Sequence, residues 1–312
     1  LFSEKIQELK DRIASVIVGQ EQTVDLILTA ILANGHVLIE GVPGVAKTLL
    51  ARLTARLIDA DFSRVQFTPD LMPSDVLGTT VFNMKTNGFD FHQGPIFADI
   101  VLVDEINRAP AKTQAALFEV MEERQISIDG TTHRMGDLYT ILATQNPVEQ
   151  EGTYKLPEAQ LDRFLMKITM DYPSLEEEVN ILERHHTNAA LVKLDDIVPA
   201  ITKEELLSLR AFMNQVFVDR TLLQYIALIV QQTRTSKAVY LGASPRASVA
   251  MLQSSKAYAL LQGRDFVTPE DIKFVAPYVL QHRLILTAEA EMEGYSPVKV
   301  TQRLIDKVEV PK

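Results

Sequence analysis

Residues 36–50 read HVLIEGVPGVAKTLL, and this stretch decides the fold. Its apolar part, Val37 to Ile39, predicts a short buried strand that stops at a glycine, and Thr48 to Ile58 has helical spacing. A turn between a strand and a helix N-terminus points backbone N–H groups at phosphate oxygens. In such a turn Lys47 would reach the outer phosphates, and the Thr48 hydroxyl would ligate Mg²⁺. The predicted phosphate loop consists of Gly41, Val42, Pro43, Gly44, Val45, Ala46, Lys47, Thr48 and Leu49.

The phosphate loop departs from the usual pattern at one position. Ala46 stands where a glycine commonly precedes the lysine. Alanine is the smallest departure available, but it would be strained if this position required a positive φ. The alternative, an ordinary Gly/Pro turn with a solvated lysine, leaves the flanking strand and helix unexplained. We therefore expect a nucleoside triphosphate site.

Two acids follow a second apolar run, in the sequence IVLVDEIN at 100–107. The carboxyl end of a buried strand is where doubly wound sheets bind ligands. One acid there can hold Mg²⁺, directly or through water, and the next can polarise the attacking water. We assign Asp104 to the metal and Glu105 to the general base. Acids also end strands by chance, but the phosphate loop upstream favours the functional interpretation.

Three further polar residues are candidates for the same site. Asn146 follows a predicted strand at 139–144 and could orient the attacking water, although Asn before Pro also forms ordinary turns. Arg163 precedes the last predicted strand and could stabilise charge on the γ-phosphate of a neighbouring subunit, or pair with a nearby aspartate. Arg246 begins a helix in the second half and could touch the nucleotide, or be a solvated first-turn arginine.

The order of predicted elements divides the chain. Strands alternate with helices in the first part, which indicates an α/β domain with a mostly parallel, covered sheet. Two alternating stretches, 81–91 with an Asn-Gly turn and 126–136 with an Asp-Gly turn, predict hairpins. Beyond Pro173 the patterns predict helices and no strand. We assign 1–190 to the α/β core and 191–312 to an all-helical domain.

Composition excludes several classes of protein. The chain of 312 residues is 46% hydrophobic and 23% charged, as in a globular protein. Its net charge of −10 disfavours a surface that grips nucleic acid throughout. The absence of cysteine excludes disulfides, thiolate catalysis and Cys-based zinc sites. No apolar run reaches membrane-spanning length, and the charged first segment does not resemble a signal peptide, so we expect a soluble, cytoplasmic protein.

The sequence resembles the MoxR family of AAA+ ATPases over nearly its whole length. The form with Ala46 agrees with that family's own phosphate loop. The markers occur in chain order as VGQ at 18–20, GVPGVAKT at 41–48, FTPDLMPSD at 67–75, FHQGPIFADIVLVDEINRAPAKTQAALFEVMEE at 91–123, ATQNP at 143–147, LDRF at 161–164 and GASPRA at 242–247.

The resemblance implies a P-loop NTPase core with a helical lid. It further implies a homo-oligomeric ring, commonly a hexamer, with ATP and Mg²⁺ bound between subunits. Such proteins are thought to act as chaperones that mature or activate protein complexes, often with a von Willebrand factor A domain partner. The hairpins would be the helix-2 insert and the pre-sensor-1 hairpin, facing the ring pore or its rim.

The resemblance also implies a role for each candidate residue. The segment Val18, Gly19 and Gln20 would lie beside the adenine. The remaining roles are Walker B for Asp104 and Glu105, sensor 1 for Asn146, arginine finger for Arg163 and sensor 2 for Arg246.

Two other functions compete with a protein-remodelling ATPase. A nucleic-acid motor of the related helicase clade would share both hairpins, but a hairpin that tracks DNA should carry a clear excess of cations and stacking aromatics. Here Lys85 is offset by Asp90 in the first hairpin, so nucleic acid is an unlikely partner. A non-hydrolysing nucleotide-binding scaffold would lack Glu105 or Arg163, and both are present.

Overall fold

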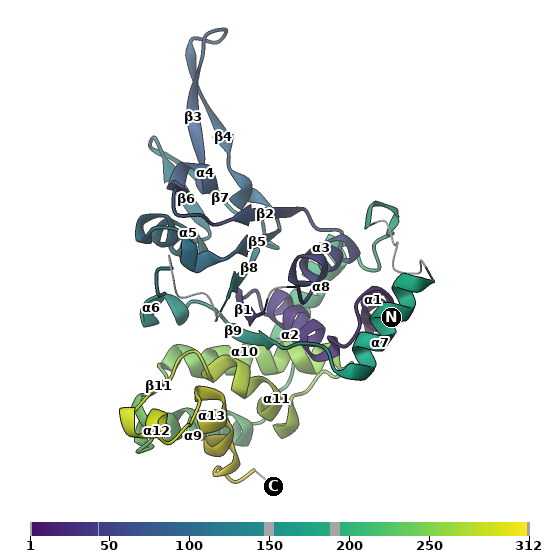
Figure 1. Ribbon diagram of the computed structural model, residues 1–312, viewed down its shortest axis with the longest axis vertical. Coiled ribbons are helices and arrows are strands. Elements are labelled where there is room, and N and C mark those ends of the chain that lie inside the picture. The colour runs from purple at the N-terminus through teal and green to yellow at the C-terminus, as the bar shows by residue number, and fades with distance from the viewer. Residues whose placement is uncertain (1, 43, 147–152, 188–193, 311–312) are drawn as a thin grey trace.

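A five-stranded parallel sheet forms the centre of the molecule (Figure 1). The computed structural model describes residues 2–42, 44–146, 153–187 and 194–310. The strands lie in the order β2-β5-β8-β1-β9, and every neighbouring pair is parallel. Their bounds are β1 Val37–Gly41, β2 Phe62–Gln66, β5 Ile100–Asp104, β8 Thr140–Gln145 and β9 Met166–Met170. The α/β fold class expected from the sequence is confirmed.

Helices cover both faces of this sheet. Successive strand residues point to opposite sides, so Leu102 packs in one apolar cluster while Val101 and Val103 pack in the other. The first cluster contains α1 (Phe2–Val16), α2 (Glu21–Leu32) and α3 (Lys47–Leu57). The second contains α4 (Pro73–Leu77) and α5 (Ala111–Glu123). Burial on both faces explains why the central strand β5 reads as a continuous apolar run in the sequence.

Two hairpins extend from the α/β core. The first, β3 (Gly78–Asn83) with β4 (Gly88–Gln93), projects far from the sheet (Figure 1). The second pairs β6 (Gln125–Ile128) with β7 (Thr131–Arg134) around the Asp129-Gly130 turn. Several large apolar side chains of the first hairpin are exposed: Val81, Phe82, Met84 and Phe89.

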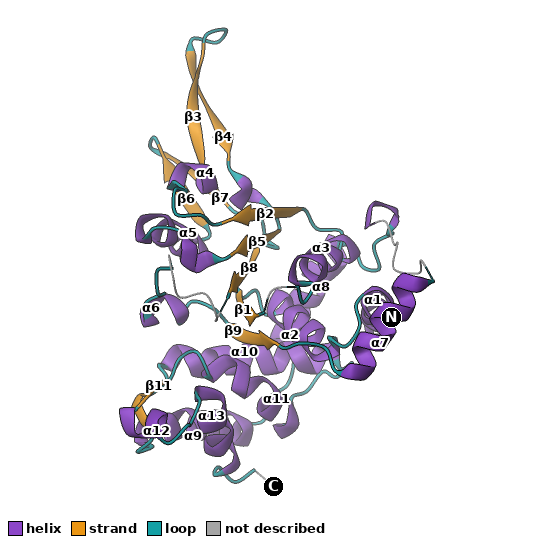
Figure 2. Cartoon of the chain, in the orientation of Figure 1, coloured by secondary structure: helices purple, strands orange, loops and turns teal. Residues whose placement is uncertain are grey.

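Beyond Pro173 the described residues are helical apart from one short ladder and an isolated bridge between Phe217 and Phe266 (Figure 2). There β10 (Val239–Leu241) pairs antiparallel with β11 (Ile285–Leu286). The expectation of no strand beyond Pro173 is wrong at this place, because runs of two and three residues carry no periodic signal. The helices are α6 Glu158–Leu161, α7 Leu175–His186, α8 Lys203–Phe212, α9 Arg220–Thr235, α10 Pro245–Leu261, α11 Pro269–Leu280, α12 Ala288–Met292 and α13 Pro297–Asp306.

Capping residues set several helix ends. Thr202 and Thr268 begin α8 and α11 with capping boxes. Helix α8 ends at Phe212 and continues as a 3₁₀ turn, Met213–Gln215. The other 3₁₀ helices are Pro95–Phe97, Ile106–Arg108 and Leu194–Asp196. No helix in the described ranges is both long and apolar enough to cross a bilayer.

The helical part and the sheet share one apolar core. Buried residues of α9, α10 and α11 belong to the same cluster as α2 and α3, and β9 is the strand nearest α10 and α11 (Figure 1). Helix α8 is tied to the α/β core, because Lys203 Nζ donates to Asp99 Oδ1 at 2.6 Å. The domain boundary assigned at 190/191 falls in 188–193, outside the described residues, and stays a prediction.

Candidate active site

The phosphate loop connects β1 to α3 through two residues with positive φ. Gly44 has φ +87°, and Ala46, the N-cap of α3, has φ +58° and ψ +25°. Position 46, where alanine stands in place of the usual glycine, therefore takes the left-handed conformation. The first turn of α3 carries no acid, so its N-terminus stays favourable for an anion. Of the predicted loop, Pro43 lies outside the described residues.

Lys47 closes the loop on itself. Its Nζ donates to the Gly41 carbonyl oxygen at 2.8 Å. Burial lowers the pKa of this lysine, and the nearby carboxylates of Asp104 and Glu105 oppose that shift. Because β1 and β5 are parallel strands of one sheet, the phosphate loop and the acids at the end of β5 lie at the same edge of it. Thr48 follows in the first turn of α3.

Asp104 is buried at the carboxyl end of β5 and binds two groups. Its Oδ1 accepts a hydrogen bond from Thr144 Oγ1 at 3.1 Å, across the β5–β8 pair. Its Oδ2 accepts from Arg64 Nε on β2 at 2.6 Å. Both carboxylate oxygens of Asp104 are thus held by neighbouring strands of the sheet.

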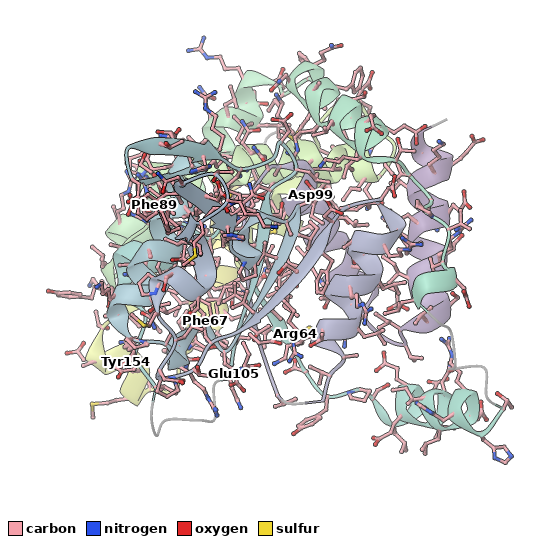
Figure 3. The ribbon with its side chains drawn as sticks, turned by 90° about the horizontal axis from the view of Figure 1, so that it is seen from above. Arg64, Phe67, Phe89, Asp99, Glu105 and Tyr154 are labelled. Carbon is pink, nitrogen blue, oxygen red and sulfur yellow. The ribbon has the colours of Figure 1, made fainter. Side chains whose placement is uncertain are left out.

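Glu105 is held beside Asp104 by three contacts. Its Oε2 accepts from Gln66 Nε2 at 2.8 Å and pairs with Arg108 Nε at 3.1 Å. Figure 3 labels Glu105 together with Arg64, the partner of Asp104. Its backbone N–H donates to Thr144 Oγ1 at 3.0 Å. The residue has φ +56°, an uncommon conformation for glutamate. Strained backbone of this kind concentrates at functional sites.

Asn146 comes next to these acids through the strand order. It follows β8, which lies between β5 and β1, so it leaves the sheet at the same edge as the phosphate loop and Asp104. It is half-buried. The adjacent Pro147, part of the motif in the sequence, lies outside the described residues.

A cavity of about 260 Å³ lies beside the phosphate loop. One wall is formed by Val18 and Gln20, the segment predicted to contact adenine, with Gly19 between them. Mixed apolar and polar walls of this kind suit a planar base. The full lining is Val16, Ile17, Val18, Gln20, Gly44, Val45, Ala46, Leu49, Pro173, Ile181, Arg184 and His185.

Helix α7 supplies the opposite wall of this cavity, which the sequence did not reveal. Ile181, Arg184 and the exposed His185 line this side of the cavity. Arg184 Nη1 donates to the carbonyl oxygens of Ala14 and Ser15 at 3.2 and 2.7 Å, which ties α7 to the end of α1. Helical periodicity alone does not say which face of α7 covers another element.

Arg163 and Arg246 lie together near the amino ends of the strands, at the opposite edge of the sheet from the phosphate loop, which follows a carboxyl end. Both pair with Glu122, near the end of α5: Arg246 Nη2 at 3.0 Å and Arg163 Nε at 3.6 Å. Arg163 therefore binds a different acid from the neighbouring aspartates that we considered. Met170, at the carboxyl end of β9, pairs with Gly41 of the phosphate loop, whereas Arg163 precedes Met166 at the amino end of the strand. The four residues from Met166 to Met170 span about 13 Å, so neither arginine meets the phosphate loop of its own chain.

The residues at the carboxyl edge fit a Mg²⁺–nucleotide complex. No group of three or more His, Asp or Glu side chains in the described parts of the chain forms a self-sufficient metal site. Mg²⁺ on a nucleotide needs only one or two protein oxygens, with phosphates and water completing its octahedron. The carboxylate of Asp104 and the hydroxyl of Thr48 are ligands of that class. No motif in the sequence marks Arg64, Gln66 or Thr144 as site residues. They are simply polar residues of the two strands beside β5.

Comparisons with known proteins identify the family of this chain. Residues 36–166 match the model of the ATPase family associated with various cellular activities (AAA), and 231–306 match the AAA lid domain. Bacillus subtilis YeaC is 47% identical over 96% of this chain and 93% of its own length. Chaperone MoxR1 of Mycobacterium tuberculosis is 44% identical over 95% and 80%. The crystal structure of a Cytophaga hutchinsonii protein with a provisional ATPase designation superposes with a TM-score of 0.91, at 41% identity over 100% of this chain and 96% of that one. The chain belongs to the MoxR family of AAA+ ATPases.

Proposed function

We propose that the protein hydrolyses ATP and uses the energy to remodel, mature or activate a protein client, as a ring that is commonly hexameric. The observation that carries this proposal is the meeting of Lys47, Asp104 and Glu105 at one edge of the sheet. A phosphate-binding lysine, a metal-binding carboxylate and a general base are the minimal set for phosphoryl transfer to water.

Each residue at the carboxyl edge has one role in this proposal. The backbone of the phosphate loop and Lys47 bind the β- and γ-phosphates. Thr48 and Asp104 would hold Mg²⁺, which would supply charge neutralisation of the phosphates. Arg64 holds the Asp104 carboxylate in place from the neighbouring strand β2.

Glu105 accepts a proton from the attacking water. Gln66 and Arg108 hold its carboxylate, and Asn146 orients the water from the end of β8. The adenine occupies the cavity between Val18–Gln20 and α7. An oriented base and a positioned nucleophile are the contributions that this chain's own residues make to the chemistry.

The second half of the site comes from a neighbouring subunit. Arg163 and Arg246 lie at the edge opposite the phosphate loop, so they complete the site of the next chain rather than their own. A head-to-tail arrangement of this kind closes into a ring when the rotation allows it. In this proposal Arg246 touches the nucleotide of the neighbouring chain.

A protein client is favoured over nucleic acid by the first hairpin. Its exposed side chains include Phe82, Met84 and Phe89, while Lys85 is its only lysine or arginine and is balanced by Asp90. Nucleic acid affinity comes largely from neutralising phosphates, and this hairpin has little excess charge for that. The chaperone name of the MoxR1 relative supports the same choice. A von Willebrand factor A domain partner and a cytoplasmic location, where ATP is supplied, complete the proposal.

The test is complementation between two inactive variants. Glu105→Gln keeps the arginines but lacks the base, and Arg163→Ala keeps the base but lacks an arginine. Each alone should lose ATP turnover by about 10³-fold or more. Mixed in equal amounts, about a quarter of the interfaces join an intact pocket to intact arginines, and turnover should return in proportion. A mixture that stays inactive would contradict the shared site, and an inactive wild type would contradict hydrolysis.

A further inference from the structure

Three consecutive lid residues, 281–283, donate hydrogen bonds to the core segment around Arg163 and to the start of β9. Gln281 Nε2 donates to the Lys167 carbonyl oxygen at 2.6 Å. His282 Nε2 contacts the Phe164 carbonyl oxygen at 3.0 Å, and it is the donor because a carbonyl only accepts. Burial lowers the pKa of His282 well below its usual value, so the ring is neutral and this proton sits on Nε2.

Arg283 makes the densest set of these contacts. Its side chain is 4% exposed. Its five N–H donors meet five acceptors: Nε donates to Asp162 Oδ1 at 2.7 Å, Nη1 to the carbonyl oxygens of Leu165 at 3.2 Å and of Val279, and Nη2 to those of Asp162 at 3.1 Å and Phe164 at 2.7 Å. A buried guanidinium with every donor used fixes the backbone it binds, because any shift leaves an N–H without a partner.

Arg163 lies in the middle of the segment that Arg283 holds. The residues on both sides, Asp162 and Phe164, are bound, while Arg163 itself extends away to the Phe118 carbonyl oxygen and to Glu122. Its side chain keeps about a third of its surface exposed, at 31%. The backbone is thus fixed and the guanidinium stays accessible to a neighbouring subunit.

Asp162, which Arg283 binds, also connects to the helix that carries Arg246. Asp162 Oδ2 accepts from Ser244 Oγ at 3.1 Å, while its Oδ1 accepts from Arg283. Ser244 is the N-cap of α10, and Arg246 lies in the first turn of that helix. Asp162 therefore joins the core residue next to Arg163 to the lid helix that carries Arg246.

We propose that Arg283 is a positioning residue that holds Arg163 of the core and Arg246 of the lid as one unit for the ATP site of the neighbouring subunit. This inference rests on the proposed function. Without the contacts of Arg283, rotation of the lid against β9 would change the spacing of the two guanidinia. Small errors in the placement of catalytic groups lower turnover strongly while leaving substrate binding nearly unchanged.

The first experiment measures ATP turnover of Arg283→Lys, which keeps the charge but cannot make five fixed hydrogen bonds. We expect kcat to fall about tenfold or more with KM for ATP within about twofold of wild type. Mixing this variant with Glu105→Gln should restore turnover as Arg163→Ala does, because its own pocket is intact. The matched control is Arg264→Lys, which alters another Arg–Asp pair in the lid, with Asp271, and should keep wild-type turnover.

A merely structural role gives a different result. If Arg283→Lys lost activity by misfolding, it would not be rescued by Glu105→Gln, and the positioning role would be wrong. Unchanged kcat in Arg283→Lys would also overturn it.

The second experiment does not depend on turnover. Amide hydrogen exchange in the full chain should speed up at residues 161–165 in Arg283→Lys and stay at the wild-type rate in α3 and in Arg264→Lys. Faster exchange across the whole chain, or no change at 161–165, would overturn the inference. If wild type does not hydrolyse ATP, the proposed function fails, and local exchange at 161–165 still decides whether Arg283 positions Arg163.

Discussion

At single residues, the site depends on backbone conformations that most side chains disfavour. Ala46 and Glu105 have φ of +58° and +56°. The left-handed conformation costs a non-glycine residue about 1–2 kcal/mol. In Glu105 this conformation comes with side-chain contacts to Gln66 and Arg108. In Ala46 it directs the chain from the phosphate loop into α3.

Substitutions at Ala46 should show this strain. Ala46→Val places a β-branched side chain at a positive φ and should lower the free energy of unfolding by about 1–2 kcal/mol. Ala46→Gly should be tolerated, because glycine adopts this conformation without a Cβ clash. Denaturant unfolding of both variants measures the difference. Equal destabilisation by valine and glycine would mean that the backbone at residue 46 is not left-handed.

His36 shows how one buried side chain links stability to pH. Its Nδ1 accepts from the Ile141 N–H at 3.0 Å and its Nε2 donates to the Met121 carbonyl oxygen at 3.1 Å. Burial, with help from the charge of Arg124, lowers the pKa of His36 to about 3. The folded state therefore excludes a proton that the unfolded chain binds below about pH 6.5.

The sign of the pH effect follows from that lowered pKa. His36 contributes no penalty above about pH 6.5, and stability falls by about 1.4 kcal/mol per pH unit as the pH drops from there toward 3. His282, whose pKa is also lowered, acts in the same direction. His36→Gln should make the plot of unfolding free energy against pH shallower by about one proton between pH 6 and pH 4.5. Parallel plots for the variant and wild type would show that His36 is protonated in the folded chain.

Among the elements, those with strong local patterns were predictable from sequence. In 36–58 an apolar run forms the strand, the glycine-rich stretch forms the turn, and the stretch with helical spacing of apolar residues forms the helix. The apolar run that ends at Asp104 forms β5. The β10–β11 ladder was not predictable because Val239–Leu241 and Ile285–Leu286 are too short to show a period. The position of α7 over the cavity was missed because it depends on contacts with α1, far away in the sequence.

Helix α7 should control nucleotide affinity. Arg184→Ala removes the bonds to the carbonyl oxygens of Ala14 and Ser15 and loosens one wall of the cavity. We expect the dissociation constant of a fluorescent ATP analogue to rise about tenfold, as for about 1.4 kcal/mol of lost binding. Glu183→Ala, an exposed position on the same helix, is the control and should bind like wild type. Equal affinity of Arg184→Ala and the control would place α7 outside the nucleotide site.

At the scale of the whole molecule, the sequence identified the chemical groups better than their arrangement. Local motifs identify the phosphate-binding and acidic residues Lys47, Thr48, Asp104 and Glu105, and the strand order brings these residues to one edge of the sheet. The cluster of Glu122 with Arg163 and Arg246 joins α5, the start of β9 and the lid, and no local pattern encodes those contacts. Arg283 was missed for the same reason, since its partners lie on the core and it stands beyond the end of α11.

In the proposed function, the two parts of one ATP site lie on opposite faces of the molecule. One edge of the sheet carries the phosphate loop and the acids, and the other carries the arginine pair. A chain with complementary halves on opposite sides associates head to tail, which forms rings or filaments rather than two-fold dimers. The shared apolar core of lid and sheet makes the subunit suited to move as one body against its neighbours.

One measurement tests the central claim most directly: ATP turnover and molar mass of wild type and Glu105→Gln, each with and without Mg²⁺–ATP. We predict that wild type hydrolyses ATP and forms a ring with nucleotide, and that Glu105→Gln forms the ring and binds ATP but turns over at least about 10³-fold more slowly. Wild-type turnover in Glu105→Gln would contradict the assignment of the base. A wild type that binds ATP tightly without turnover or assembly would contradict the divided catalytic site.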